Sequence, residues 1–132
     1  MQFGLDHVQL AIPENGEELA RSFYSDVLCL HEIIKPEALR KRGGVWYELD
    51  DSRQLHLGVE QEFKPNRKAH PCFVASELDL LASLLSENGH SVKFDDLNPP
   101  IRRFYVEDVF GNRLEFANGH SVSQRVSHDE PK

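Results

Sequence analysis

The chain has few cysteines, little basic charge and no long hydrophobic run, and each of these absences excludes a class of protein. Its two cysteines, Cys29 and Cys72, lie inside apolar patterns without close spacing, so neither a disulfide framework nor a thiolate metal site is expected. We expect both to be small buried side chains in a reducing compartment. A net charge of −7 opposes the phosphate backbone of nucleic acids, and we expect no nucleic-acid partner.

No segment has the apolar length of a signal peptide or a membrane span. The first residues, MQFGLDHVQLAIP, lack a basic start and include Asp6 and His7, so they do not resemble a leader. We therefore expect a cytoplasmic protein without a membrane partner. With 132 residues and 39% hydrophobic content, the chain is long enough for one domain with a core and too short for two.

The first half of the chain predicts one strand, one helix and three further strands. Residues 7–12 alternate between polar and apolar side chains, which is the period of a half-buried strand. Apolar residues then recur at helical spacing from 19 to 28, after the start signals Asn15 and Gly16. Three extended segments follow, separated by the loop ALRKRGG and the turn DDSR, at residues 31–34, 45–49 and 55–59.

The second half repeats this order. A strand over 70–75 leads to a helix that ends at Gly89, and Ser76 with Asp79 resembles a capping box before it. Extended segments follow at 91–94, 103–106 and 113–117, the last two joined by the turn EDVFGN, in which Gly111 is expected to have a positive backbone angle. We predict one domain over residues 1–119, with modules at 4–62 and 68–118 and a polar tail at 120–132.

Superposing the two halves places four polar side chains at equivalent positions. His7 falls on His70, and His56 falls on Glu115. Each lies on the strand face opposite the apolar side chains that pack beneath the helices. We predict an α+β fold of two βαβββ modules related by a pseudo-twofold axis, with curled sheets that form an open, barrel-like cleft and bring the four groups to its floor.

Imidazole nitrogens and one carboxylate oxygen form a donor set for a divalent first-row metal, with open positions for water or substrate. The candidate metals are Fe, Mn, Zn, Ni and Co. A single histidine on a polar strand face is usually a solvated side chain, so it is the joint placement of His7, His56, His70 and Glu115 that favours a metal site. The remaining histidines are expected at the surface or in loops: His31, His90, His120 and His128.

Other side chains are candidates for holding a substrate. Arg102 and Arg103, with the basic residues of segment 64–68, suit an anionic ligand, although short basic clusters are more often a solvated rim. Aromatic residues lie in the strands that should form the cleft walls, and one of each adjacent pair must face inward. Gln9 shares the face of His7. The aromatic candidates are Trp46, Tyr47, Phe104 and Tyr105.

The order of modules, with a histidine opening each one and a glutamate after a D-x-F-G-N turn, resembles the vicinal oxygen chelate superfamily. That group includes glyoxalase I, extradiol dioxygenases, fosfomycin resistance enzymes and bleomycin resistance proteins. The resemblance covers residues 4–118, and its most specific segments are DHVQLAI, AHPCFVAS and RRFYVEDVFGNRLEFAN taken together.

The resemblance implies that His7, His70 and Glu115 are metal ligands. His56 stands where glyoxalase-like members commonly have a glutamate ligand, which removes one candidate carboxylate base. Glu115 is then expected to exchange ligation for proton transfer, as its analogue does in glyoxalase-like enzymes. Tyr105 or Tyr47 would supply a hydrogen bond to a side chain that binds the metal.

We expect a metal-dependent enzyme, of the lyase, isomerase or dioxygenase type, that acts on a small oxygen-bearing substrate. The alternative is a non-catalytic protein that sequesters a drug or metabolite, as bleomycin resistance proteins do. A purely structural domain has no positive support. A homodimer is expected because open sheet edges need cover and because the resemblance implies one; whether the four ligands meet within one chain or across two is left open.

Overall fold

Two mixed four-stranded sheets, each with its own helix, make up the computed structural model, which describes residues 1–119 and 123–127. The first sheet has the order β1-β4-β3-β2, and the second has the order β5-β8-β7-β6. Module one contains β1 (His7–Ile12), α1 (Glu17–Tyr24), β2 (His31–Ile33), the 3-10 helix η1 (Glu37–Arg42), β3 (Val45–Glu48) and β4 (Gln54–Val59). Module two contains β5 (Cys72–Val74), α2 (Leu78–Glu87), β6 (Lys93–Asp95), β7 (Arg103–Glu107) and β8 (Arg113–Ala117).

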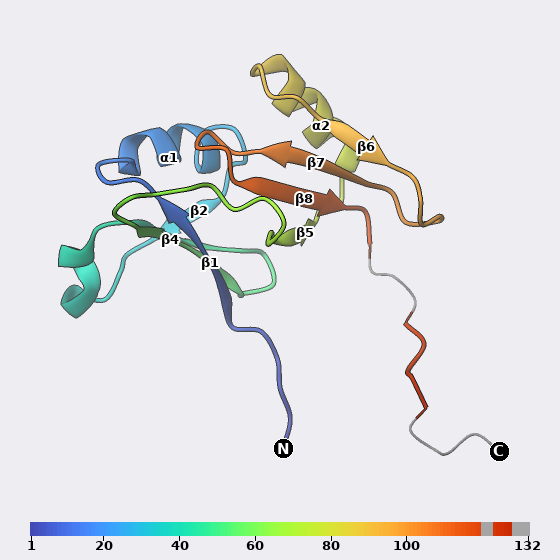
Figure 1. Ribbon diagram of the computed structural model, residues 1–132, viewed down its shortest axis with the longest axis horizontal. Coiled ribbons are helices and arrows are strands. Elements are labelled where there is room, and N and C mark those ends of the chain that lie inside the picture. Colours follow the sequence, from blue (N-terminus) through green and yellow to red (C-terminus); the bar gives the residue numbers. More distant parts are fainter. Residues whose placement is uncertain (120–122, 128–132) are drawn as a thin grey trace.

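The two sheets have the same topology. In each, the first strand pairs in parallel with the last, and the remaining neighbours are antiparallel. The predicted α+β class and the internal repeat are confirmed. Figure 1 shows α1 and α2 on the same side of the two sheets. The strand edges left unpaired in the described chain belong to β1, β2, β5 and β6.

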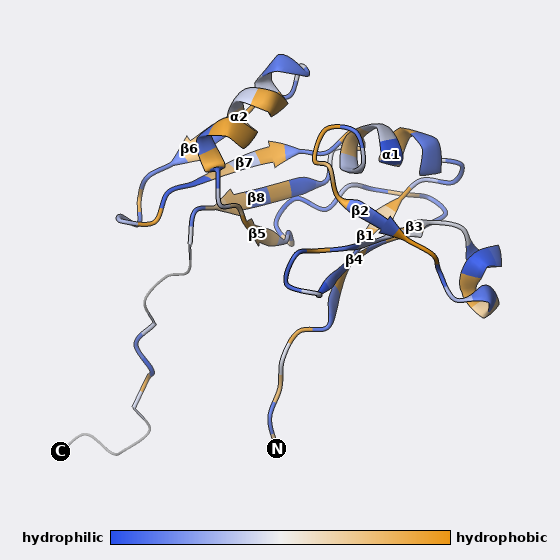
Figure 2. Cartoon of the chain, turned by 180° about the vertical axis from the view of Figure 1, so that it is seen from behind, coloured by the Kyte–Doolittle hydropathy of each residue, from blue (hydrophilic) through white to orange (hydrophobic). Residues whose placement is uncertain are grey.

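A continuous core lies between the helices and the strand faces turned toward them. Alternation along the strands sends Leu55 and Leu57 into this core, and Phe104 and Leu114 do the same in module two. Phe23 of α1 contacts the ring of His90 from module two, so the core crosses the junction between modules. In Figure 2 the hydrophobic residues of α2 and β7 form orange stretches in neighbouring elements.

Buried polar contacts also tie the modules together. The Tyr24 hydroxyl of α1 donates to Asp108 Oδ2 at 2.6 Å. Asn112, which is fully buried, donates from Nδ2 to Ala11 O at 2.9 Å and accepts at Oδ1 from the backbone N–H of Asn66 at 3.0 Å. The β7–β8 turn therefore binds α1, β1 and the segment between the modules. We call Tyr24, Asp108 and Asn112 the inter-module clamp.

Some local predictions were wrong. Helix α2 has Glu77 at its N-cap without a side-chain cap hydrogen bond, so Ser76 and Asp79 do not form a capping box; the Asp79 carboxylate instead accepts from Arg102. Both cysteines are exposed rather than buried, because Cys29 follows the end of α1 and Cys72 lies on the edge strand β5.

Other local predictions hold. Gly111 has φ of 93°, as the turn requires, and His31 is exposed at the sheet edge. Residues 123–127 of the predicted tail are exposed and have no helix or strand. The rest of the tail, with His120 and His128, lies outside the described residues. No helix in the described part of the chain is long and apolar enough to cross a membrane.

Candidate functional site

Three aromatic rings stack on the open face of the module-one sheet, the face turned away from α1. Trp46 lies directly across from His56 in the β3–β4 register, and their rings are parallel with centroids 3.7 Å apart. His7 lies diagonally across the β1–β4 pair, and its ring stacks on the other side of His56 with a centroid distance of 4.1 Å. Because it is sandwiched in this way, His56 is only 5% exposed. We call these residues the ring stack.

Hydrogen bonds orient both imidazoles of the ring stack. His7 Nδ1 lies 2.9 Å from Asp6 Oδ2, and His56 Nε2 lies 2.8 Å from Gln54 Oε1. Burial, and then the neighbouring His7, lower the pKa of His56, because desolvation and a nearby cation both disfavour the imidazolium. The lowered pKa favours the neutral imidazole of His56, which is the form that can bind a metal.

The open face of module two carries a hydrogen-bonded ion cluster at the matching place. His70 Nε2 lies 2.9 Å from Glu115 Oε1, and Glu115 is 8% exposed. His70 Nδ1 lies 2.9 Å from Lys68 O. A carbonyl oxygen only accepts, so Nδ1 carries a proton and Nε2 faces the carboxylate. We call His70, Glu115 and Arg103 the charged cluster.

Arg103 closes the charged cluster on its other side. It donates from Nη2 to Asp95 Oδ2 at 2.9 Å and from Nη1 to Glu115 Oε2 at 3.4 Å. A hydrogen bond from the backbone of Leu97, and then Arg103, hold the pKa of Asp95 below its usual value. The Arg103 Nε is buried without a hydrogen-bond partner among the described residues. The ring of Tyr105 lies edge-on to His70, with centroids 5.6 Å apart.

The two clusters occupy equivalent places, as the repeat predicts. Glu115 pairs across β7–β8 with Tyr105, as His56 pairs across β3–β4 with Trp46. The donor chemistry suits a divalent metal, because a ligating histidine usually donates its second ring nitrogen to a carboxylate or a backbone carbonyl. Within residues 1–119 and 123–127, however, no three His, Cys, Asp or Glu side chains come together as a metal site. The chain thus brings the predicted ligands together in two pairs.

The other predicted site residues divide between the two sheet faces. Tyr47 is fully buried on the helix side, where its hydroxyl bonds to Ser25 Oγ at 2.8 Å. Arg102 is paired with both oxygens of Asp79 and lies over the ring of Phe94. Tyr47 and Arg102 therefore lie outside the two clusters, whereas Gln9 is beside the ring stack, directly across from His56.

Cys72 pairs across β5–β8 with Glu115. Partial burial, and then the Glu115 carboxylate, raise the pKa of its thiol to about 11. At neutral pH the thiol is therefore protonated and a poor nucleophile.

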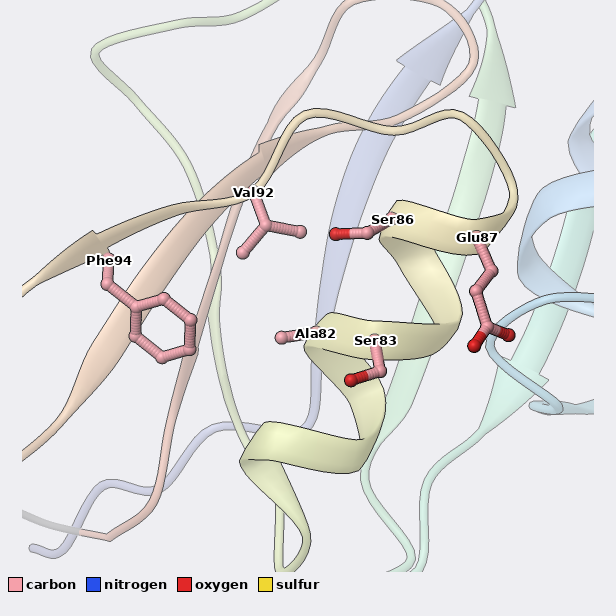
Figure 3. Close-up of a pocket in the computed structure, with 6 residues that line it drawn as sticks. All are labelled: Ala82, Ser83, Ser86, Glu87, Val92 and Phe94. Carbon is pink, nitrogen blue, oxygen red and sulfur yellow. The ribbon is translucent and has the colours of Figure 1, made fainter.

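Hollows in the described surface include a groove on the helix side and a cavity beside the ring stack. A groove of about 370 Å³ lies between α2 and β6 (Figure 3), on the helix side of the sheet, and has no histidine or cysteine in its lining. A second cavity, of about 180 Å³, borders the ring stack at Trp46 and Gln9. Its lining includes Lys35 and Arg42, which the sequence pattern did not single out because the loop ALRKRGG carries no recognisable motif.

Comparison with known proteins identifies the class of fold. No family model and no curated protein matches the chain. Among solved structures, a Bacillus anthracis protein assigned to the glyoxalase family is 44% identical, covering 89% of this chain and 95% of its own, with a TM-score of 0.85. A glyoxalase/dioxygenase from Nostoc punctiforme is 22% identical over 86% of this chain and 89% of its own, with a TM-score of 0.72.

A third structure carries the family name in full. It is a member of the glyoxalase/bleomycin resistance protein/dioxygenase superfamily from Sphaerobacter thermophilus, 16% identical over 88% of this chain and 97% of its own, with a TM-score of 0.71. The paired βαβββ modules, each with a four-stranded mixed sheet, have the vicinal oxygen chelate fold. With the identity of 44% to the Bacillus anthracis protein, the chain belongs to the glyoxalase/bleomycin resistance protein/dioxygenase superfamily.

Proposed function

We propose that the protein is a divalent-metal-dependent enzyme that acts on a small oxygen-bearing substrate, as a lyase or isomerase or as a dioxygenase. Members of this superfamily are often metal-dependent. The observation that carries the proposal is the pairing of His70 with Glu115, in which a second hydrogen bond to Lys68 O fixes the imidazole. His70 Nε2 and the Glu115 carboxylate would hold a divalent cation, which would displace the proton that they now share.

The ring stack and the charged cluster are proposed to be two halves of one site. Each contributes two ligands, His7 with His56 and His70 with Glu115, and neither half is a complete site alone. Because the described residues of one chain hold no group of three ligands, we assign completion of the site to a second copy. The unpaired strand edges offer surfaces for such a homodimer.

A bound metal would act as a Lewis acid toward substrate oxygens. The residues of the chain would do the remaining work. Glu115 would take a proton from the substrate and return it, because it is the carboxylate at the site and a carboxylate can act as a general base. Arg103 holds the second carboxylate oxygen at 3.4 Å, which fixes the direction of Glu115. Tyr105 limits the movement of the His70 ring from its edge.

A non-catalytic ligand-binding protein is the second candidate, and the ring stack is the observation that favours it. Three flat rings with Trp46 outermost form a surface on which a planar ligand can stack. In this alternative the ion pairs of the charged cluster only stabilise the sheet. In either case the free thiols Cys29 and Cys72 suit the reducing cytoplasm.

Elemental analysis of protein purified without chelator tests the proposal. We expect near-stoichiometric metal in the wild type and its loss in His70→Ala. The matched control is His31→Ala, which removes an exposed histidine from the edge strand β2 and should leave the metal content unchanged. Absence of metal in the wild type even after reconstitution with Fe, Mn, Zn, Ni or Co would contradict the enzyme proposal and favour ligand sequestration.

A further inference from the structure

Two cations line the cavity beside the ring stack, and neither is paired with an acidic side chain within residues 1–119 and 123–127. Lys35 and Arg42 both border it, with Gln9 and Trp46 on the wall toward the histidines. Lys35 donates from Nζ to the carbonyl oxygen of Gly43. Arg42 is exposed, and its guanidinium has no hydrogen bond or ion pair within residues 1–119 and 123–127.

Module two has the opposite arrangement at the equivalent place. Matching the β2–β3 register to the β6–β7 register puts Lys35 on Asp95 and Gly44 on Arg103. In module two the Arg103 guanidinium is neutralised by Asp95 at 2.9 Å. In module one the Arg103 position is a glycine, and the Asp95 position is a lysine. An ion pair in one module is thus replaced by a hollow with unpaired positive charge in the other.

Two glycines shape the backbone around this cavity. A Cβ on Gly44, which has φ of 90°, would lie 2.1 Å from the carbonyl oxygen of Leu57, so only glycine permits this bend. A Cβ on Gly58 would lie 3.1 Å from the Gln9 side chain, and its absence lets Gln9 lie over the strand. Glu17 approaches from α1, where its carboxylate accepts from the Gly44 N–H at 2.8 Å.

We propose that this cavity binds the anionic arm, a carboxylate or a phosphate, of the substrate whose other end reaches His56. A guanidinium forms paired hydrogen bonds with either anion, and the ammonium adds a point charge. Gly58 lies two residues beyond His56 on β4, so the arm and the reacting end would be about 7 Å apart. The assignment of the reacting end to His56 depends on the proposed function. The assignment of the anion subsite does not depend on it.

Trp46 is the only tryptophan in the chain and lines the cavity, so its fluorescence reports on occupancy. The titrants are inorganic phosphate, acetate and neutral acetamide at constant ionic strength, with protein as purified and after chelator treatment. We expect phosphate or acetate to change the fluorescence with a Kd on the order of 1–10 mM, and acetamide to have no effect. The anion that binds more tightly identifies the arm.

Arg42→Gln is the principal variant, because an exposed side chain without a partner is dispensable for folding. It should weaken anion binding about tenfold or more, whereas Lys41→Gln, a neighbouring exposed lysine outside the cavity lining, should leave it unchanged. Binding that is absent from the wild type, that survives Arg42→Gln, or that disappears after chelator treatment would overturn the subsite. Metal content measured on the same samples reports separately on the proposed function.

Discussion

The open faces of the two modules share strand order and register, and each carries a matched histidine, His7 or His70, yet the side chains around that histidine differ. Trp46 over His56 corresponds to Tyr105 over Glu115, and the cross-strand geometry is the same in both. In module one the result is a stack of aromatic rings beside a cationic hollow. In module two it is a cluster of ions that neutralise one another.

Under the proposed function, this difference would divide one task between the two halves of a repeated fold. The charged cluster has the only carboxylate among the four candidate ligands, Glu115, and the arginine that orients it. The ring stack has no carboxylate among its members, and its pocket accepts charge from a ligand instead. A side chain at a given repeat position therefore has a function set by its cross-strand neighbours as well as by its place in the fold.

The largest expected effect comes from removing the carboxylate that distinguishes the two clusters. Loss of a hydrogen-bond partner of a metal ligand typically weakens metal binding by roughly 10–100-fold. Glu115→Ala removes a proposed ligand itself and should weaken metal binding by more than that. His56→Ala, at the equivalent position, removes a neutral donor and should cost less. Competition titrations with a chromophoric chelator measure both. Equal losses would mean that the two clusters contribute alike.

A substitution that gives module one the carboxylate of module two tests whether the two positions are equivalent. His56→Glu places a carboxylate beside His7, as Glu115 lies beside His70 in module two. An added anionic oxygen should restore or tighten metal binding. Loss of the ring that stacks on Trp46 should expose the indole to water and red-shift the tryptophan emission. Metal binding weaker than in His56→Ala would show that the module-one half does not face the metal.

The turns that join the last two strands of each module differ as sharply as the open faces. Asn112 is fully buried and bonds to Ala11 and Asn66. Its equivalent in module one, Arg53, is exposed, and it bonds to Asp51 in its own turn and donates from Nε to the exposed carbonyl oxygen of Leu5. Asn112→Ala should lower the free energy of unfolding by about 2–3 kcal/mol, because it leaves the backbone N–H of Asn66 and the carbonyl oxygen of Ala11 without their hydrogen-bond partner. Arg53→Ala should change it by less than about 0.5 kcal/mol. Urea unfolding measures both, and similar values would contradict the inter-module clamp.

Removing one hydroxyl from the inter-module clamp should have the smallest effect. Burial, and then the Asp108 charge, raise the pKa of Tyr24. The protonated hydroxyl therefore contributes stability that is complete below the unfolded pKa of about 10 and is lost as the pH rises through the raised value. Tyr24→Phe should cost about 1–2 kcal/mol at neutral pH and flatten the loss of stability above pH 10. Thermal melts across that range would show parallel curves if the hydroxyl were unimportant.

Much of the fold could be predicted from the sequence because its determinants are local. Strand alternation and helical spacing gave the element order, and matching His7 to His70 and His56 to Glu115 gave the repeat that the strand registers confirm. The wrong capping box had a different cause. Asp79 is paired with Arg102, which lies on another element, and no local pattern shows a partner so distant in sequence.

The same limit applies to the charges around the site. Arg103 has the form of an anion-binding residue, but its partners Asp95 and Glu115 become visible only when β6, β7 and β8 are side by side. Lys35 and Arg42 lie in a loop without a motif, and their importance depends on the hollow beneath them. The candidate ligands could be selected from the sequence because they repeat, whereas their division into two pairs depends on the distance between the sheets.

Complementation between two defective chains tests the central claim. According to this claim, each metal site consists of the ring stack of one chain and the charged cluster of a second chain. One chain carries His7→Ala with His56→Ala, the other carries His70→Ala with Glu115→Ala, and each is purified alone and after co-expression. The account predicts that neither binds metal alone and that the mixed dimer regains one site, formed by the intact halves of the two chains. A mixed dimer without metal, beside a wild type that binds it, would place the whole site within a single chain and contradict the account.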